Sequence, residues 1–213
     1  MADGFANGNK NPCSTPEGLL LDRQLFADQC KISARAEHGG MVVCGLWMAE
    51  SDDIEAKLKL ARQTWDESRH AMAFYQRARE LGADLDMDPP QSPVLQPLIP
   101  FLMEARTLVE RSTLINLCVE VLAVESFHAT KPLVDMASRE LLDFILADEV
   151  THVQLGKWVV DHFCTTPEAR ARHDEFQGRV DEALAKGRQT LAQQLADQAV
   201  ALVGCSVTAP GME

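Results

Sequence analysis

The chain has 213 residues, of which 46% are hydrophobic and 24% charged, a composition typical of one globular domain with a sizeable core. Its formal net charge of −12 argues against nucleic acid or an anionic membrane surface as a partner. No apolar run reaches the roughly 18 to 20 residues that a membrane-spanning helix needs, and no secretory or transit signal is recognisable at the N-terminus.

Six cysteines are scattered along the chain without a Cys-x-x-Cys pair. This spacing is typical of reduced thiols and not of a disulfide framework or a thiolate zinc site, so we expect a cytoplasmic protein. Residues 1–14 are rich in Gly and Asn and are expected to be flexible. Residues 15–213 are expected to form a single domain.

Two long helices are predicted in the first half of the chain. The sequence Ser-Thr-Pro at 14–16 is typical of a helix start, and apolar residues then recur every three or four positions to about Ala49. After a short turn at 51–53, a second helix is predicted to run to about Leu81, with Gly82 ending it. The short turn makes these two helices antiparallel neighbours.

A proline-rich segment separates this pair from a second pair of helices. Five prolines lie within 83–100, so we expect a long loop there with at most a short helical piece. The third helix is predicted over 100–129, a turn over 130–135, and the fourth helix over 135–163. The short turn again makes the two helices antiparallel neighbours.

A fifth helix is predicted from the Thr-Thr-Pro-Glu start at 165–168 to about Leu202. Its narrow apolar stripe could cover the other helices or pair with a second subunit in a homodimer, and consists of Val180, Leu184, Leu191, Leu195 and Leu202. No segment alternates apolar and polar residues long enough to predict a strand. The expected fold is therefore all-α: a ferritin-like four-helix bundle with a long crossover between helices two and three, plus an additional C-terminal helix.

The pattern Asp-Glu-x-x-His occurs twice, on the second and on the fourth predicted helix. Glu67 and His70 are three residues apart, as are Glu149 and His152, so each pair points the same way from one turn of its helix. A dimetal carboxylate site in a four-helix bundle takes one Glu-x-x-His from each of two helices and a single Glu from each of the other two. The sequence therefore predicts such a site, provided that the remaining helices carry matching carboxylates.

Both remaining helices carry a glutamate at the required height. Glu37 lies 30 residues before the Glu of the first motif, and Glu120 lies 29 residues before that of the second, as in an internal duplication. Glu125 is a second candidate on the third helix, and it forms another Glu-x-x-His with His128. The spacing favours Glu120 as the ligand and leaves Glu125 and His128 as supporting or surface groups.

The types of ligand favour iron. Four carboxylates balance the charge of two divalent ions, and His and Glu ligands without a thiolate suit Fe(II) or Mn(II). Without cations, four carboxylates in a low-dielectric core would be very costly. Asp66 and Asp148 precede the two motif glutamates, and we expect each to accept a hydrogen bond from the outer nitrogen of a metal-binding histidine. The predicted cofactors are two iron ions, with Mn possible at one or both positions, and O₂ as co-substrate.

The motifs DESRH and DEVTH resemble those of bacterial non-haem di-iron oxygenases, with the nearer likeness to the aldehyde-deformylating oxygenase family. In the second half, the stretch from Glu120 to Gly156 follows that family's pattern without a gap, with matches at Glu120, Pro132, Asp135, Arg139, Asp148, Glu149, His152 and Gly156. The first half matches at Glu67, Arg69, His70 and Phe74. The resemblance implies metal ligands at Glu37, Glu67, His70, Glu120, Glu149 and His152.

Two departures distinguish the chain from that family. Phe127 and Thr130 stand where the family has aromatic hydroxyls, and the chain is shorter after the fourth helix. The metal site therefore carries over and the fatty-aldehyde substrate does not, so we expect oxidation of another small, partly apolar molecule. Arg35 and Arg111 could bind a substrate carboxylate, although surface charges are the commoner role of such residues. Candidate pocket walls are core-facing side chains near the ligands, namely Met41, Cys44, Phe74, Leu117, Val121, Val124, Phe127 and Leu155.

Other functions of such a fold fit the residues less well. A ferritin-like ferroxidase or iron-storage protein is the main alternative, but its centres usually carry at most one histidine. A rubrerythrin-like peroxidase needs a second Glu where the chain has Ala123, and a radical-storing subunit needs a tyrosine beside the metals, whereas the single Tyr75 is off the ligand face. The net charge disfavours a tRNA hydroxylase, and the buried carboxylates disfavour a metal-free structural bundle.

The source of electrons follows from the missing cofactor motifs. No Gly-x-Gly-x-x-Gly follows a predicted strand, so the sequence does not predict binding of a nicotinamide or flavin. Electrons are therefore expected from a separate ferredoxin or reductase, unless the small-molecule substrate supplies them.

Overall fold

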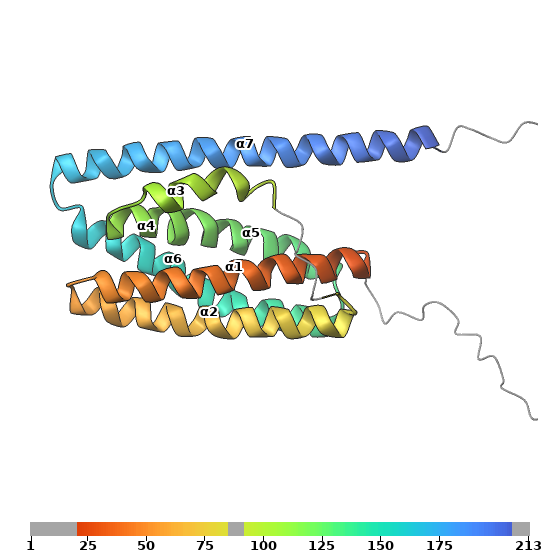
Figure 1. Ribbon diagram of the computed structural model, residues 1–213, viewed down its shortest axis with the longest axis horizontal. Coiled ribbons are helices and arrows are strands. Elements are labelled where there is room, and N and C mark those ends of the chain that lie inside the picture. Colours follow the sequence, from red (N-terminus) through yellow and green to blue (C-terminus); the bar gives the residue numbers. More distant parts are fainter. Residues whose placement is uncertain (1–20, 85–91, 206–213) are drawn as a thin grey trace, which may run out of the picture.

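The computed structural model describes residues 21–84 and 92–205, and all regular secondary structure within these ranges is helical. The prediction of an all-α chain is confirmed. The long helices are α1 (Arg23–Glu50), α2 (Ile54–Leu81), α6 (Met136–Phe163) and α7 (Pro167–Cys205). The shorter elements, in chain order, are η1 (Gln96–Leu98), α3 (Ile99–Glu104), α4 (Leu108–Leu114), η2 (Ile115–Val119), α5 (Glu120–Thr130) and η3 (Lys131–Leu133) (Figure 1). Among these residues, no helix is apolar over a length sufficient to cross a lipid bilayer.

α1 and α2 form a helical hairpin that turns at 51–53, as predicted (Figure 1). α1 begins later than predicted because Asp22 caps it. The Asp22 carboxylate accepts hydrogen bonds from the backbone N–H groups of Gln24, at 2.9 Å, and Leu25, at 3.0 Å. The earlier part of the predicted start, 15–20, lies outside the described residues.

The predicted end of α2 and the predicted start and end of α6 are confirmed. α2 stops at Gly82, which has a φ of 90°, a conformation that costs glycine little because it lacks a Cβ. α6 starts after Asp135, whose carboxylate accepts a hydrogen bond from the backbone N–H of Ser138 at 2.8 Å. α6 then runs without interruption to Phe163.

The prediction of one continuous third helix over 100–129 is wrong. The chain leaves α3 after Glu104 and enters α4 through a capping box. The Thr107 hydroxyl accepts a hydrogen bond from the Glu110 N–H at 3.2 Å, and the Glu110 carboxylate accepts one from the Thr107 N–H at 2.9 Å. This exchange satisfies two backbone donors at the start of α4 and fixes the break between α3 and α4.

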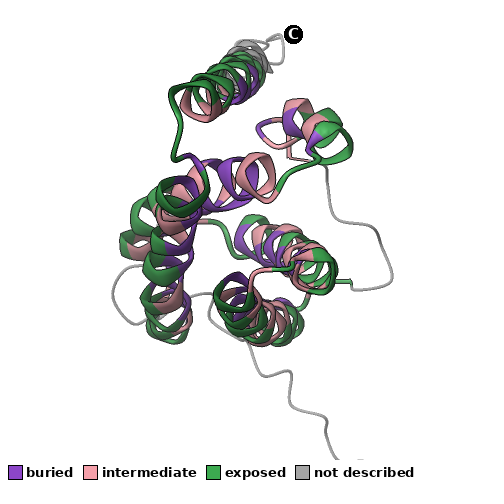
Figure 2. Ribbon diagram, turned by 90° about the vertical axis from the view of Figure 1, so that its left-hand side faces the viewer, coloured by how far each residue is buried: buried purple, intermediate pink, exposed green. Residues whose placement is uncertain are grey.

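The core lies between α1, α2, α6 and the α4–η2–α5 segment, whose buried residues face inward (Figure 2). It contains two hydrophobic clusters. On α1, Phe26 belongs to one cluster and Trp47 to the other, and the buried Glu37 lies between them. On α6, Leu142 and Val159 flank the second motif in the same way. The predicted ligands therefore lie at one level, in a polar layer between two apolar ones.

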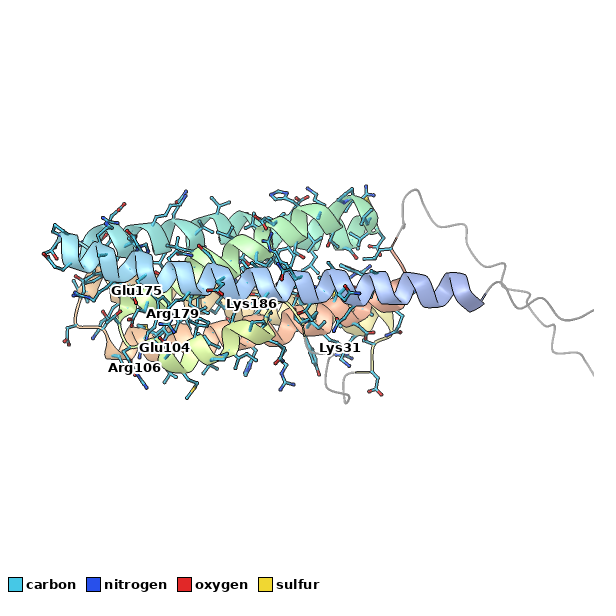
Figure 3. All side chains as sticks on the ribbon, turned by 90° about the horizontal axis from the view of Figure 1, so that it is seen from above. Lys31, Glu104, Arg106, Glu175, Arg179 and Lys186 are labelled. Carbon is cyan, nitrogen blue, oxygen red and sulfur yellow. The ribbon has the colours of Figure 1, made fainter. Side chains whose placement is uncertain are left out.

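α7 lies across α3 and α4 (Figure 1). Val180 is fully buried in the core cluster that contains Trp47, and Leu184 packs against that cluster. Arg179 binds the Glu104 carboxylate through two nitrogens, at 2.5 and 2.6 Å (Figure 3). The first part of the predicted stripe thus covers the core. The last two leucines of the stripe are among the side chains that are not described.

Candidate dimetal centre

Four carboxylates meet in the polar layer, one from each helix that encloses the core. They are Glu37 of α1, Glu67 of α2, Glu120 at the start of α5 and Glu149 of α6, and none is more than 8% exposed. Carboxylates are almost never buried to this degree without a compensating partner. The arrangement therefore calls for hydrogen-bond donors or cations between them.

The histidine of the second motif faces three of these carboxylates with its Nδ1 atom. His152 Nδ1 lies 2.8 Å from Glu149, 3.5 Å from Glu67 and 3.6 Å from Glu120. One atom each of Glu67, Glu120 and His152 lie within 4.8 Å of one another, which is close enough for a single ion to bind all three. We call this group the His152 triad.

The histidine of the first motif has the corresponding position on the other side. His70 Nδ1 lies 3.4 Å from Glu149 and 3.6 Å from Glu37. Glu37, Glu67 and His70 form a second group with ligand atoms within 4.8 Å, which we call the His70 triad. Glu67 belongs to both triads, and Glu149 contacts both histidines, so these two carboxylates are placed to bridge two ions.

The two aspartates of the motifs contact the outer nitrogens of the histidines, and they do so crosswise. His70 Nε2 lies 3.4 Å from Asp148 of α6, and His152 Nε2 lies 3.7 Å from Asp66 of α2. Each aspartate therefore supports the histidine of the opposite helix. The predicted role of Asp148 fits this geometry, in which an outer carboxylate can orient the ring of a histidine. Asp66 faces His152 but lies beyond hydrogen-bonding distance of its Nε2 atom.

Two arginines of α2 hold both aspartates. Arg69 Nη2 lies 2.7 Å from Asp66 and 2.6 Å from Asp148, and Arg62 lies 2.6 Å and 3.3 Å from the same two residues. Burial of Asp66 opposes its charged form, but the hydrogen bonds from Arg62 and Arg69 outweigh burial and lower the pKa of Asp66. The arginines thus hold both aspartates beside the outer nitrogens of the histidines. Asp148 lies within hydrogen-bonding distance of His70 Nε2, whereas His152 Nε2 has no hydrogen-bond partner among the described residues.

Sequence reasoning missed a buried amide pair beside the His152 triad. Gln63, only 1% exposed, donates from Nε2 to Glu67 at 2.8 Å and to Glu120 at 3.0 Å. Asn116, also 1% exposed, donates to the Gln63 carbonyl oxygen at 2.8 Å, which directs the Gln63 amino group toward the carboxylates. The signal was present in the sequence, because Gln63 and Asn116 each stand four residues before a predicted ligand and so share its helix face.

Asn116 belongs to η2 (Ile115–Val119), a π-helical turn that directly precedes Glu120. A π turn adds one residue to an α-helix, which changes the direction of the side chains that follow, and such turns are frequent at functional sites. Asn116 lies within this turn and Glu120 directly follows it, and both are buried in the polar layer. A regular helical pattern does not reveal this insertion.

Gly40 leaves room for a shared carboxylate. A Cβ atom at this position of α1 would lie 3.3 Å from the Cδ atom of Glu67, closer than nearly all contacts of that kind. A side chain on residue 40 would therefore force the Glu67 carboxylate to shift by a few tenths of an ångström.

The protonation of the site follows from the burial of its carboxylates and from the ion pair between His152 and Glu149. Burial, together with the hydrogen bond to Glu67, raises the pKa of Glu37 well above its usual value, and burial together with Glu149 and Glu67 does the same for Glu120. Burial also opposes the charge of His152, but its hydrogen bonds to Glu120 and Glu149 outweigh this and raise its pKa to about 11. Burial disfavours the Glu149 carboxylate, yet the hydrogen bond from His152 and the proximity of His70 lower its pKa to about 2.

The residues of the site fit two divalent cations. His70 Nδ1 and Glu149 Oε1 are buried without a hydrogen-bond partner although they lie 3.4 Å apart. Leaving such atoms unpaired is costly, and a cation between them would bind both. The donors are carboxylate oxygens and imidazole nitrogens, a set that suits iron or manganese. The nearby Cys44 is a neutral thiol, because burial raises its pKa well above its usual value.

An apolar cavity of about 490 Å³ adjoins the centre on the side of α1. It lies between α1 and the α4–η2 segment, beneath η1 and α3. Its lining is mostly aliphatic, with Ile32 and Val43 of α1, Leu98 of η1 and Ile115 of η2 among the members. Gly40, the residue beside Glu67, is also part of the lining, so the cavity lies next to the predicted ligands, although none of them lines it.

A polar groove reaches the centre from the opposite side. It runs between α2 and α6, and its lining includes Lys59, Arg62 and Trp158 together with Gln63 and His152 of the site. The centre thus has an apolar approach beside Gly40 and a polar approach beside His152.

The predicted pocket walls are not where the apolar cavity lies. Cys44 and Leu155 are in the core cluster with Trp47, and Phe74 and Phe127 are in the other cluster with ring centroids 5.5 Å apart. The remaining candidates, Met41, Leu117, Val121 and Val124, are half-buried, and none of the eight lines the cavity. The cavity instead uses the face of α1 that carries Gly39 and Gly40, and the segment at 92–102.

The structure also separates the other candidates. Glu125 is exposed and binds Arg188 of α7 at 2.6 Å, and His128 is exposed, so neither reaches the centre. Arg35 lines the apolar cavity, whereas Arg111 binds Glu50. Of the two candidates on the third predicted helix, only Glu120 lies with the other five predicted ligands.

No protein-family model matches the sequence, and neither a curated protein nor a solved structure is significantly similar to it.

Proposed function

We propose that the protein is a non-haem di-iron oxygenase or oxidase that uses O₂ to oxidise a small, partly apolar organic molecule. The observation that supports this most is the meeting of six buried predicted ligands. Five of them form two triads that share Glu67, and the sixth, Glu149, lies beside both histidines, with its unpaired Oε1 atom facing the unpaired Nδ1 atom of His70. Such a group of ligands makes physical sense when two divalent ions neutralise it. Its resemblance to the aldehyde-deformylating oxygenases supports the same proposal.

We further propose that the fold is ferritin-like. The α1–α2 hairpin supplies Glu37 and the first motif, and the α5–α6 pair supplies Glu120 and the second motif. The long connection between α2 and α4 takes the place of the crossover. This order of elements and ligands is the one that dimetal carboxylate proteins of this fold use.

Each group of residues has a defined task in this proposal. Two iron ions, bound by the six ligands, would supply the redox chemistry that activates O₂. Asp66 and Asp148 keep the two imidazoles oriented through their outer nitrogens, and Gln63 holds two carboxylates in place with a neutral donor. Gly40 leaves the Glu67 carboxylate room to shift as the charge of the centre changes.

The apolar cavity favours oxidation of an organic substrate over iron storage. Aliphatic side chains line the cavity on the α1 side, next to the carboxylates at Gly40, where they would bind an apolar group and exclude water from the reaction. Hydrated iron ions, which ferroxidases take up, gain nothing from such a lining. Reducing equivalents would come from a separate ferredoxin or reductase, or from the substrate itself.

The proposal is tested by anaerobic loading with Fe(II), followed by iron analysis and by O₂ uptake. We expect about two irons per chain, and O₂ uptake that stays in stoichiometric proportion to the electrons supplied. Glu120→Ala should lose most of the bound iron and the O₂ uptake. Glu125→Ala is the matched control, because this glutamate is five residues further along α5 and is exposed.

Three results would count against the proposal. A wild-type protein without bound metal would remove its basis. Equal losses in both variants would show that Glu120 has no special role. Accumulation of many irons per chain as a mineral would identify an iron-storage protein instead.

A further inference from the structure

The outward face of α2 carries a regular series of exposed apolar side chains. Its large members and their exposed fractions are Ile54 (70%), Leu58 (66%), Trp65 (62%), Met72 (65%) and Tyr75 (46%). Ala61 and Ser68 occupy the intermediate positions. The steps along the series are four, three, four, three, four and three residues, which is the heptad spacing of a helix that packs against another helix along its length.

This apolar seam lies opposite the face of α2 that carries Glu67 and His70, so the metal centre does not account for it. Within the described part of the chain, α2 packs against α1 and α6 on its inner side (Figure 2). Single exposed apolar residues are common on protein surfaces, but a continuous series over three heptads marks an interaction site.

We propose that a second copy of this chain binds the seam through its own α2. The two α2 helices pack antiparallel around a two-fold axis, which crosses each helix at the height of the peptide between Asp66 and Glu67. In this register, the side chains fit one another by size. Trp65 faces Ser68 of the second copy, and Met72 faces Ala61 of the second copy. Each bulky side chain thus meets a small one, as knobs-into-holes packing requires. A two-fold axis repeats each of these contacts.

The charges beside the seam favour the antiparallel orientation. The acidic residues Asp52, Asp53 and Glu55 lie at the start of α2, and Arg79 lies in its last turn. The neighbouring Glu80 is paired with Arg77 of its own helix, and Glu55 is paired with Lys59. The two-fold axis brings Arg79 of one copy close to the acidic start of α2 in the other. A parallel pair would place the acidic starts side by side, where like charges repel.

The size of the seam is sufficient for a stable dimer. Its five large side chains leave roughly 600 to 700 Å² exposed on each copy, so two copies would bury about 1,300 Å², within the range of stable interfaces. The seam is also flanked by Arg62 and Arg69, which follow Leu58 and Trp65 by four residues and hold the aspartates of the metal centre. Dimer formation would thus shield these ion pairs from water.

Sedimentation velocity over about 1 to 100 µM protein tests the proposal, because dimer formation depends on concentration. We expect a dimer for the wild type and a monomer for Trp65→Glu, which places two charges at the axis. Leu46→Glu is the matched control: Leu46 is 57% exposed on α1, outside the seam, and its variant should remain dimeric. Circular dichroism and iron content check that both variants are folded.

Tryptophan fluorescence gives a second readout that does not require a change at Trp65. Of the three tryptophans, Trp47 is 7% exposed, Trp158 is half-buried on α6 and Trp65 is 62% exposed, so Trp65 is the most accessible to acrylamide in a monomer. Trp158 lies outside the seam and contributes the same background in every variant. Met72→Glu should increase quenching at high protein concentration, because it frees Trp65 from the interface. A wild type that stays monomeric over the whole range would overturn the proposal. A dimer that persists in both Trp65→Glu and Met72→Glu would overturn it as well, since it must use another surface.

Discussion

The two halves of the proposed metal centre differ in how their carboxylates are supported. In both halves a Glu-x-x-His contributes two ligands, and an aspartate of the opposite helix contacts the histidine. Four residues before Glu67, however, the chain has Gln63, whereas four residues before Glu149 it has Ile145. The amide binds two carboxylates of the His152 triad, and the isoleucine is part of the hydrophobic core.

This difference means that the two triads are not equally prepared for a metal ion. The Gln63 amide holds Glu67 and Glu120 near His152 without adding charge. Among the described residues, no side-chain amide does the same for Glu37. A site whose ligands are already in place loses less conformational entropy on binding. We therefore expect the first ion to bind the His152 triad and the second to bind the His70 triad more weakly.

Removing Glu67, the carboxylate shared by both triads, should weaken metal binding more than any other single substitution. Glu67→Ala takes a ligand from both triads, so we expect both ions to bind at least about 100-fold more weakly. Glu37→Ala takes a ligand from the His70 triad only, and about one ion per chain should remain tightly bound. Anaerobic titration with Fe(II), followed by metal analysis after desalting, measures both. Equal loss of metal in the two variants would contradict the assignment of Glu37 to one side.

Binding at the His152 triad should be the more dependent on pH. His152 and Glu120 have raised pKa values in the metal-free chain, and both must lose a proton before they bind a cation. Because protons compete with the metal, affinity should increase with pH, by up to about 100-fold per pH unit if two protons are displaced. Calorimetry in buffers of different ionisation enthalpy counts the released protons. Release of no protons would show that these groups are already deprotonated.

Gln63→Leu should bring the affinities for the first and the second ion closer together. The variant removes the donor to Glu67 and Glu120 but keeps a buried side chain of similar size, so we expect the first ion to bind about 10- to 100-fold more weakly. The affinity for the second ion should change less. Gln76→Leu, an exposed position on the same helix, is the matched control and should bind both ions as the wild type does. Unchanged affinity for the first ion in Gln63→Leu would exclude a positioning role for this amide.

The sequence predicted the ligands because their positions depend on local repeats. Glu67 and His70 share a helix face by spacing alone, and the similar offsets of Glu37 and Glu120, 30 and 29 residues before the motif glutamates, follow from two similar hairpins. The structure brings these residues together, while their binding of metal stays a prediction. Thr107 and Glu110 also carried a readable signal, a capping box, but the apolar pattern around them gave preference to one long helix.

Other features depend on how distant segments meet, and no local pattern contains them. The contact between His70 and Asp148 requires α2 and α6 to lie side by side at a particular height. The apolar cavity forms only because the segment at 92–102 folds over α1 beside Gly40. The π turn before Glu120 adds a residue that no periodic pattern of apolar residues reveals.

The aspartates offer the finest test of the comparison, because each one supports the histidine of the opposite helix. Asp148→Asn keeps the shape of the side chain but removes the charge next to His70 Nε2, so the second ion should bind about tenfold more weakly. Asp66→Asn removes the charge next to His152, so the first ion should be weakened instead. The crossed contacts thus predict that a substitution on α6, at Asp148, weakens the ion beside His70 of α2. A substitution on α2, at Asp66, should weaken the ion beside His152 of α6. Titrations that show each variant weakening the ion next to the histidine of its own helix would refute this crossed arrangement.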